Sequence, residues 1–354
     1  MSFSAPPTSQ ADVWLLLDNI QVSAFTGGDW ITATVGPWVG NSSISSSTPG
    51  NIAFSFQGTA ISFKGNTPSS RFSPTWFLAS IDSNTPYNVS FPDAGPTQIY
   101  TQWYQTPILI DGLHTINLSR IAVGFDYAII TPGPTTPLSG STIVVDDRNS
   151  EVTYNGNGWV IDVNELDFGE DMIGGLPMGN TTHRTSSVGD GFEFQFAGDS
   201  IALYGFFEWT STGSISIDFT LDNETTPSSL FLHGGAPISQ FITSYQFFSA
   251  DNIDAGNHTL LMNVTAAFGN QSFVFDYLTY TPSFSLLESK PNFTSPSSIS
   301  LTRHKNGAIA GGIVGGLVGL TIFVALTLVY RRGRKLARLI YSTSRLSIQR
   351  LVVH

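Results

Sequence analysis

Apolar and polar residues alternate strictly in two short stretches that lie far apart in the chain. The stretches are residues 52–56 (IAFSF) and 192–196 (FEFQF). A period of two is the signature of a β-strand with one buried face, and the last two phenylalanines of each stretch then share that face. Both stretches are therefore predicted to be core strands.

A glycine follows each of these strands, and a second apolar run follows the glycine. Gly58 precedes the run that starts at Ile61, and Gly198 precedes the run that starts at Ile201. Two apolar runs separated by a short turn predict a β-hairpin. We therefore expect a hairpin at both places.

The two stretches belong to a longer internal repeat. The matching segments are 17–30 with 146–159, 51–65 with 191–205, 81–85 with 221–225, 111–118 with 255–262, and 125–132 with 275–282. The first pair aligns without a gap, which equates Asp18 with Asp147. Two copies of about 130 residues predict tandem domains rather than a solenoid, whose units are shorter.

Many short strands, turns rich in Gly, Pro and Asn, and no helical periodicity predict an all-β protein. We expect two tandem jelly-roll β-sandwich domains, at 12–132 and 142–283, joined by a linker at 133–141. The repeated FDY motif would be the last strand of each domain. Its Phe and Tyr are expected on the buried face, which would leave Asp126 and Asp276 exposed.

One segment near the C-terminus has the length and composition of a transmembrane helix. Residues 308–330 contain no charged residue and no proline, and at 1.5 Å per residue they span about 34 Å, enough for a bilayer core. We place this helix at 307–330. Four basic residues follow it, so the positive-inside rule puts residues 1–306 outside the cell or in a secretory lumen. Gly311, Gly315 and Gly319 form a small-residue face on which a homodimer could pack.

Charge and glycosylation motifs agree with this orientation. All 26 acidic residues and only 8 of the 15 basic ones precede the predicted helix, which argues against a nucleic-acid partner. Nine Asn-x-Ser/Thr motifs predict N-glycosylation on the same side. They start at Asn41, Asn88, Asn117, Asn180, Asn223, Asn257, Asn263, Asn270 and Asn292.

The remaining segments are a Ser/Pro/Thr-rich connection and a basic tail. Residues 284–306 are rich in Ser, Pro and Thr and predict a stalk. Residues 331–354 carry seven Lys/Arg and no acidic residue, so we expect this cytoplasmic tail to lie on anionic lipid. The first residues do not read as a secretory leader. We expect a leader ahead of this start, the alternative being that the transmembrane helix itself directs translocation.

The repeat also resembles a known family. Its pattern F-x-F-x-G-x-x-I followed by G-x-H-T-L/I and a closing apolar strand is similar to that of galactose-binding-domain-like β-sandwiches. It resembles in particular the tandem copies in single-pass surface proteins of filamentous fungi. The resemblance covers both repeats. It implies a jelly-roll sandwich whose loops bind glycans in many members, and a structural calcium ion in some.

Exposed aromatic rings are the side chains expected to bind sugar, because the C–H faces of a sugar pack on π faces. Trp30 and Trp159 occupy equivalent repeat positions and are expected in the core. The candidates without such a counterpart are Trp76, Trp103, Tyr104 and Trp209. Core packing remains the alternative for each of them.

Titratable residues give weaker signals. His114 and His258 precede Thr at matching positions, and without ligand-type partners in the sequence a structural role in a turn is expected. Asp146, Asp147 and Glu151 would form either a cation site, such as one for calcium, or a solvated acidic turn. The chain contains no cysteine, which excludes disulfides and thiolate chemistry, and it lacks the common catalytic motifs.

Together these features predict a surface glycoprotein of the plasma membrane or another secretory-pathway membrane. Its ectodomain would bind wall or extracellular carbohydrate without catalysis and without a cofactor. A structural or sensor protein with a protein-binding or spacer ectodomain is the alternative. A sugar-acting enzyme is a third possibility that the sequence favours less.

Overall fold

Extended strands make up nearly all of the regular structure. The computed structural model describes residues 13–19, 24–34, 38–68, 75–91, 97–164, 173–207, 211–232 and 242–293. Within these ranges the other regular elements are the short 3-10 turns η2 (Val39–Asn41), η3 (Met178–Asn180) and η4 (Leu287–Ser289). The prediction of an all-β fold with sandwich-like sheets is confirmed.

The predicted membrane helix at 307–330, with Gly311, Gly315 and Gly319, lies outside the described residues, as do the basic tail and Trp209. Among the described residues no helix has the length and apolar character needed to cross a bilayer.

The first repeat forms two facing sheets. Its strands are β1 (Trp14–Asp18), β2 (Phe25–Gly27), β3 (Ile31–Ala33), β4 (Ser43–Ser45), β5 (Gly50–Gly58), β6 (Ala60–Asn66), β7 (Trp76–Ile81), β8 (Tyr87–Ser90), β9 (Gln98–Ile99), β10 (Thr101–Gln105), β11 (Gly112–Ile121) and β12 (Gly124–Thr131). One sheet has the order β10-β6-β12-β1, with β4 beside β12 and β3 beside β4. The other has the order β2-β5-β11-β7-β8.

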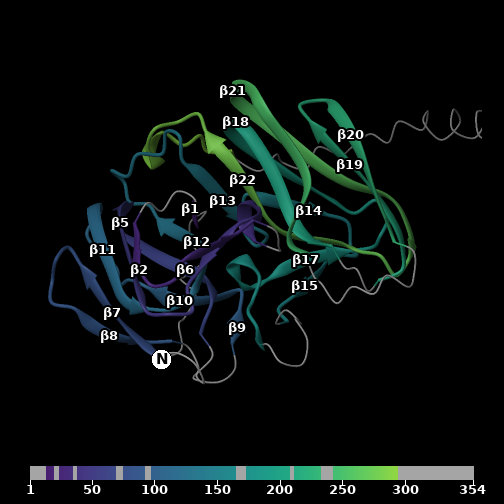
Figure 1. Cartoon of the computed structure of the whole chain (residues 1–354). Helices are drawn as coiled ribbons and strands as arrows, with labels where there is room; N and C mark the ends of the chain where they lie inside the picture. The colour runs from purple at the N-terminus through teal and green to yellow at the C-terminus, as the bar shows by residue number, and fades with distance from the viewer. Residues whose placement is uncertain are drawn as a thin grey trace, which may run out of the picture. The chain divides into compact units, whose positions relative to one another are not determined.

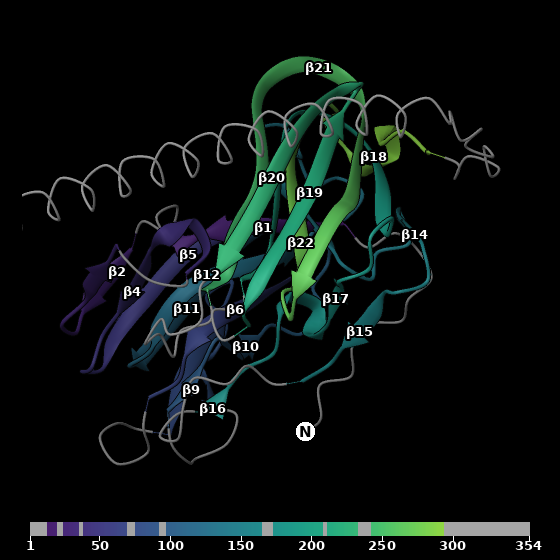
Figure 2. The ribbon, with the colours of Figure 1, turned by 90° about the vertical axis from the view of Figure 1, so that its right-hand side faces the viewer.

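The second repeat follows the same plan with longer strands. They are β13 (Thr142–Asp146), β14 (Val152–Asn155), β15 (Val160–Asp162), β16 (Ile173–Gly174), β17 (Thr182–Thr185), β18 (Gly191–Phe207), β19 (Gly213–Leu221), β20 (Glu224–Leu232), β21 (Ile242–Gly269) and β22 (Phe273–Pro282). Figure 2 shows the long, curved β18 and β21 next to β19 and β20. The first half of β18 pairs with the second half of β21, and the second half of β18 pairs with the first half of β21 and with β22.

The predicted hairpins do not form. β5 pairs with β2 and β11, whereas β6 pairs with β10 and β12, so the chain crosses at Gly58 from one sheet to the other. The apolar faces of the two strands then pack against each other instead of lying side by side. The rings of Phe54 and Phe63 meet edge to face with centroids 5.5 Å apart. Alternation and a turn glycine signal a hairpin and such a crossing equally well, because both reverse the chain.

The first strands of the two repeats pair with each other and join the repeats into one sheet. β1 lies antiparallel to β13, with Leu15 opposite Ile143, and the two strands run side by side between the repeats (Figure 1). Leu15 faces Ile130 on β12, and Ile143 faces Tyr280 on β22. The pair Leu15 and Ile143 therefore consists of equivalent residues, so this ladder has local pseudo-two-fold symmetry.

The same registers correct the gapless alignment of the first segments. Asp18 lies opposite Tyr127, and Asp146 lies opposite Tyr277. Asp18 thus corresponds to Asp146 and not to Asp147, and the second repeat has one extra residue in the turn that follows. A single inserted residue in a turn leaves no mark on a short alignment of low identity.

The closing strands bury the aspartates that were expected at the surface. Asp126 and Asp276 are both fully buried. On β12 the register shifts between Phe125 and Tyr127, and on β22 it shifts at the same place, so each Asp is the extra residue of a β-bulge. A bulge breaks the period of two. Phe125 consequently joins the main core, while Tyr127 lies in a second apolar cluster at the junction.

Candidate functional site

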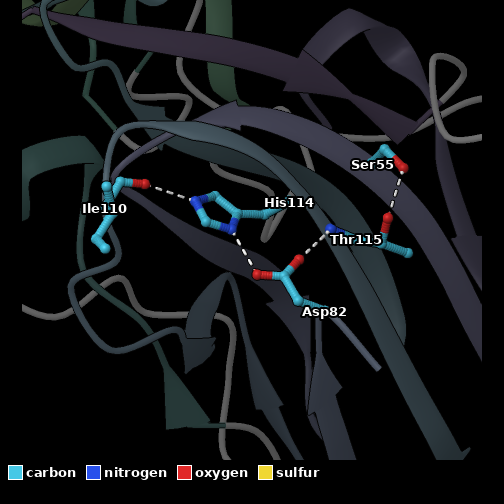
Figure 3. A network of polar contacts seen from close by, with 5 residues as sticks. All are labelled: Ser55, Asp82, Ile110, His114 and Thr115. Carbon is cyan, nitrogen blue, oxygen red and sulfur yellow. Dashed lines mark hydrogen bonds and ion pairs between the residues drawn. The ribbon is translucent and has the colours of Figure 1, made fainter. Parts of the chain in front are cut away.

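A histidine holds a turn to a strand in the first repeat (Figure 3). His114 on β11 donates from Nδ1 to Asp82 Oδ2 at 2.7 Å and from Nε2 to the carbonyl oxygen of Ile110 at 2.7 Å. Asp82, in the turn after β7, also accepts the backbone N–H of Thr115 at 2.9 Å. We call this arrangement the His–Asp clamp.

The second repeat contains the same clamp. His258 on β21 lies 2.5 Å from Asp222 Oδ2 and donates from Nε2 to the carbonyl oxygen of Asp254 at 2.7 Å. Asp222 accepts the backbone N–H of Thr259 at 2.8 Å. The expectation that these histidines lack charged partners is therefore wrong. The matching segments 81–85 and 221–225 already contained the partner aspartates, and the repetition of each aspartate together with its histidine was the missed signal.

The geometry sets the protonation state of both clamps. Each imidazole nitrogen faces a carbonyl or carboxylate oxygen, both of which accept hydrogen bonds, so the form with hydrogen on both nitrogens is favoured. Burial alone lowers the pKa of His114 and of His258, but the aspartate and the carbonyl together raise the pKa of each above its usual value. The hydrogen bond from His114 lowers the pKa of Asp82. A histidine engaged at both nitrogens has no free base, which argues for a structural part rather than proton transfer.

The outer face of the sheet β2-β5-β11-β7-β8 carries the one predicted aromatic candidate that is partly exposed. Phe77 and Ala79 on β7 point into the core, so Trp76 and Leu78 point outwards. Trp76 is half-buried, and the guanidinium of Arg120 lies 4.6 Å from its ring centroid. A cation over an indole ring is favourable and fixes the ring orientation.

Polar side chains surround this tryptophan on the same face. Asn88 lies opposite Leu78 across the β7–β8 ladder, and Asn117 lies opposite Ser80 across the β7–β11 ladder. Ser55 and Thr115 share a hydrogen bond of 3.1 Å further along the face. We call this surface, with Trp76 and Arg120 at one end, the Trp76 face. It combines one aromatic ring with amides and hydroxyls.

Two of the other predicted ligand residues lie elsewhere. Trp103 and Tyr104 on β10 are 2% and 5% exposed, so the expectation that they are exposed sugar-binding rings is wrong and the alternative of core packing holds. The register of β10 shifts between Gln102 and Tyr104, and this bulge turns two consecutive aromatics into the core against Phe63. Buried rings offer no platform to a ligand. Trp209 lies outside the described residues.

The acidic residues at the end of β13 and in the turn after it, Asp146, Asp147 and Glu151, form neither a cation site nor a solvated turn. Asp147 is fully buried and accepts hydrogen bonds from Thr181 Oγ1 at 2.7 Å and His183 Nδ1 at 2.6 Å. Glu151 pairs with Lys290. In the described parts of the chain no three acidic, histidine or cysteine side chains are grouped to hold a metal ion.

The nine Asn-x-Ser/Thr asparagines are all exposed. Two of them are structurally equivalent, because Asn41 and Asn180 both end a 3-10 turn with a positive φ, 58° and 73°. Exposure is necessary for the predicted modification, and the structure meets this condition at every site.

Comparison with known proteins identifies no family. No protein-family model matches the chain, and no curated protein is similar to it. Among solved structures it is similar to a Paenibacillus xanthan lyase (TM-score 0.27, 11% identity, 79% of this chain and 28% of that one). It is also similar to a two-domain esterase active on acetylated mannans (TM-score 0.28, 12% identity, 44% and 40%). A third is Clostridium perfringens ZmpB, whose structure includes two CBM51 domains (TM-score 0.22, 9% identity, 73% and 37%).

The chain thus spans less than half of the length of each of these three proteins. Their names place them among carbohydrate-active or carbohydrate-binding proteins. At these TM-scores the similarities carry no argument about the ligand or the activity of this chain.

Proposed function

We propose that this chain is a single-pass surface glycoprotein whose two jelly-roll domains, at 12–132 and 142–283, form a non-catalytic carbohydrate-binding ectodomain. The observation that carries the proposal is the Trp76 face. An indole ring oriented by Arg120 and bordered by amide and hydroxyl groups supplies both contacts that a sugar needs, an apolar surface for its C–H groups and hydrogen-bond partners for its hydroxyls.

The absence of catalysis is part of the proposal. Both clamp histidines have their ring nitrogens engaged, and glycoside hydrolysis needs two carboxyl groups facing each other across an open cleft. In the carboxyl pair of Asp18 and Asp126, Asp126 is fully buried and Asp18 is half-buried. The membrane anchor at 307–330 and the outward orientation rest on the sequence, through the apolar segment and the basic residues after it.

One observation favours the spacer alternative. Asn88 and Asn117 are predicted glycosylation sites and lie on the Trp76 face. Glycans attached there would cover the face and prevent binding of another sugar. The ectodomain would then serve as a rigid, glycan-coated spacer.

Binding of the full-length chain, purified in detergent, to a panel of glucans, mannans, galactans, xylans and chitin tests the proposal. We expect binding to at least one polymer, and we expect Trp76→Ala to weaken it about tenfold, as loss of one stacking contact implies. Ser216 occupies the equivalent position in the second repeat, so Ser216→Ala is the matched control and should bind normally.

Two further outcomes separate the alternatives. Binding that appears only after Asn88→Gln and Asn117→Gln, or after enzymatic removal of N-glycans, would support the spacer function. Binding that survives Trp76→Ala would show that the ligand uses another surface, and no binding under either condition would refute the carbohydrate proposal.

A further inference from the structure

The junction between the repeats contains two buried acidic side chains with few hydrogen bonds. Among the described residues, Asp126 faces only one hydrogen-bond donor, the backbone N–H of Val39, which lies outside normal hydrogen-bond geometry, and Asp276 has one partner, the equivalent N–H of Met178 at 3.4 Å. Both residues are fully buried. An ionised carboxylate in such a place carries a large desolvation cost, so the neutral, protonated form is favoured.

Further acidic groups face these two carboxyls. Asp18 on β1 faces Asp126, while Asp146 at the end of β13 and the following Asp147 face Asp276. Burial raises the pKa of Asp126 and of Asp276 well above the usual value for a carboxyl, and these neighbouring carboxylates raise it further. The repetition of the arrangement in both repeats shows that it belongs to the fold and is not an accident of one site.

The other charged groups around the cluster are few in the described part of the chain. Lys64 on β6 is 8% exposed, and its charge opposes the increase in the pKa of Asp276. Burial lowers the pKa of Lys64 to about 8. Arg148 opposes the increase in the pKa of Asp146, and His183 is hydrogen-bonded to Asp147.

Tyrosines complete the surroundings. The buried phenols are Tyr100, which follows β9, Tyr127 on β12 and Tyr277 on β22, with Tyr204 of β18 stacked on Tyr277. Their pKa values are raised by burial, so they stay neutral up to alkaline pH. The phenols therefore add no charge to the surroundings of Asp126 and Asp276 at neutral pH.

The buried carboxyl groups of Asp126 and Asp276 lie where the two repeats contact each other. Residues of both repeats form the second apolar cluster, among them Tyr127 and Tyr277. Next to it, β9 of the first repeat pairs in parallel with β16 of the second. Tyr100 of the first repeat and Tyr277 of the second both lie 3.4 Å from the hydroxyl of Ser244. New negative charge at Asp126 or Asp276 would thus act on the contacts between the repeats.

We propose that the junction is a proton-dependent latch. The paired strands β1 and β13, which join the repeats, are called the seam below. Protons on Asp126 and Asp276 keep the seam closed, and loss of these protons at rising pH weakens it. Both groups hold their proton more tightly in the closed state than in an opened one, so the closed state is most stable at low pH and loses stability as the pH rises above the ordinary range of a carboxyl. Each pH unit in that window shifts the opening equilibrium about tenfold per group.

Hydrogen exchange of the full-length chain between pH 5 and pH 8, corrected for the intrinsic exchange rate, measures this opening. We expect the protection of residues 14–18 and 142–146 to fall about tenfold or more over this range. Strands β5 and β11, in the opposite sheet of the first repeat, are the internal control and should change less. Equal changes in the seam and in the control strands would overturn the proposal.

Substitutions test which groups are responsible. The variant Asp126→Asn/Asp276→Asn carries permanently neutral side chains of the same shape, and it should keep the seam protected at pH 8. Asp251→Asn, at an exposed position, should behave as the wild type. A double variant that keeps the wild-type decrease in protection would refute the latch.

Two measurements keep the test decisive if the double variant does not fold. Lys64→Met removes the cation that opposes the increase in the pKa of Asp276, so the loss of protection should continue to higher pH and become larger, whereas an unchanged loss would contradict the assignment to Asp276. The infrared C=O band of protonated carboxyls should be present in the wild type at neutral pH and should decrease on titration to alkaline pH. Its absence at neutral pH would exclude the protonated pair.

Discussion

Single histidines connect distant segments of each repeat. The clamp ties the turn after β7 to β11, and its copy ties the turn after β19 to β21. The histidines are 10% exposed, whereas Asp82 and Asp222 are 43% and 46% exposed. Solvent therefore screens the ion pairs, and each contributes modestly to stability.

Asp82→Asn and Asp222→Asn should each lower the pKa of one histidine. Asp82→Asn is expected to lower the pKa of His114 and leave that of His258 unchanged, and Asp222→Asn should do the reverse, so each variant is the control for the other. Histidine titration by NMR measures both. A shift of both histidines in either variant would contradict the separate clamps.

The same variants should lose stability in acid. A histidine with a raised pKa stabilises the fold below its ordinary pKa, and this contribution disappears as the pH rises through the raised value. We expect each variant to be less stable than the wild type by about 1 kcal/mol at pH 5 and equal to it at pH 9. Thermal unfolding at both values provides the measurement, and a constant difference would speak against the clamp.

Glycine is required in the 3-10 turns that cover the acidic residues of the junction. Gly179 has a φ of +65°, and a Cβ atom there would overlap Oδ1 of Asp146. Gly140 has a φ of +75° with no atom near its missing Cβ. Gly140→Ala should therefore cost only about 1 kcal/mol, the backbone penalty, and Gly179→Ala clearly more. Chemical denaturation compares them, and equal costs would mean that the turn can move away from Asp146.

At the scale of elements, β-bulges decide which residues the sequence predicts wrongly. The extra residue lies at Trp103 on β10, at Asp126 on β12 and at Asp276 on β22. In each case strict alternation places a side chain on the wrong face. The strands themselves and their repetition follow from the sequence, because alternation and turn residues are local properties.

The pairing of those strands does not follow from local properties. The crossing between β5 and β6 and the β1–β13 seam depend on which partners lie nearby in the folded chain. For the candidate site, the sequence predicted Trp76 but not its partner Arg120, which lies on another strand. It also did not predict that each clamp histidine pairs with its aspartate, because the two residues lie more than 30 positions apart. Contacts between segments far apart in sequence are the part that one sequence does not reveal.

Two tryptophans in different sheets of the first repeat should differ sharply in their effect on stability. Trp103 packs against Phe63, Phe77 and Phe125 in the core, so Trp103→Ala should cost about 3–5 kcal/mol. Trp76 lies on the outer face, and Trp76→Ala should cost about 1 kcal/mol or less. Urea unfolding of the two variants measures the difference. Similar losses would contradict the assignment of Trp103 to the core and of Trp76 to the surface.

At the scale of the molecule, the two repeats depend on each other. β1 has a neighbour on both sides, β12 and β13, and the described residues form part of one compact unit. Separating the repeats would expose an unpaired strand on each, and such edges associate.

Either repeat produced alone, as residues 1–138 or 139–295, should therefore self-associate or aggregate, whereas residues 1–295 should not. Size-exclusion chromatography with light scattering distinguishes the two outcomes. Stable monomers of both halves would show that the seam contributes little.

The register of the seam also bears on the origin of the chain. Leu15 faces its own equivalent, Ile143, and Trp14 faces Val144, the equivalent of Leu16. Two identical chains related by a two-fold axis would make the same ladder, as in an isologous dimer. A gene encoding one such module could thus have formed a homodimer first, and duplication with fusion would then have preserved an existing interface instead of creating a new one.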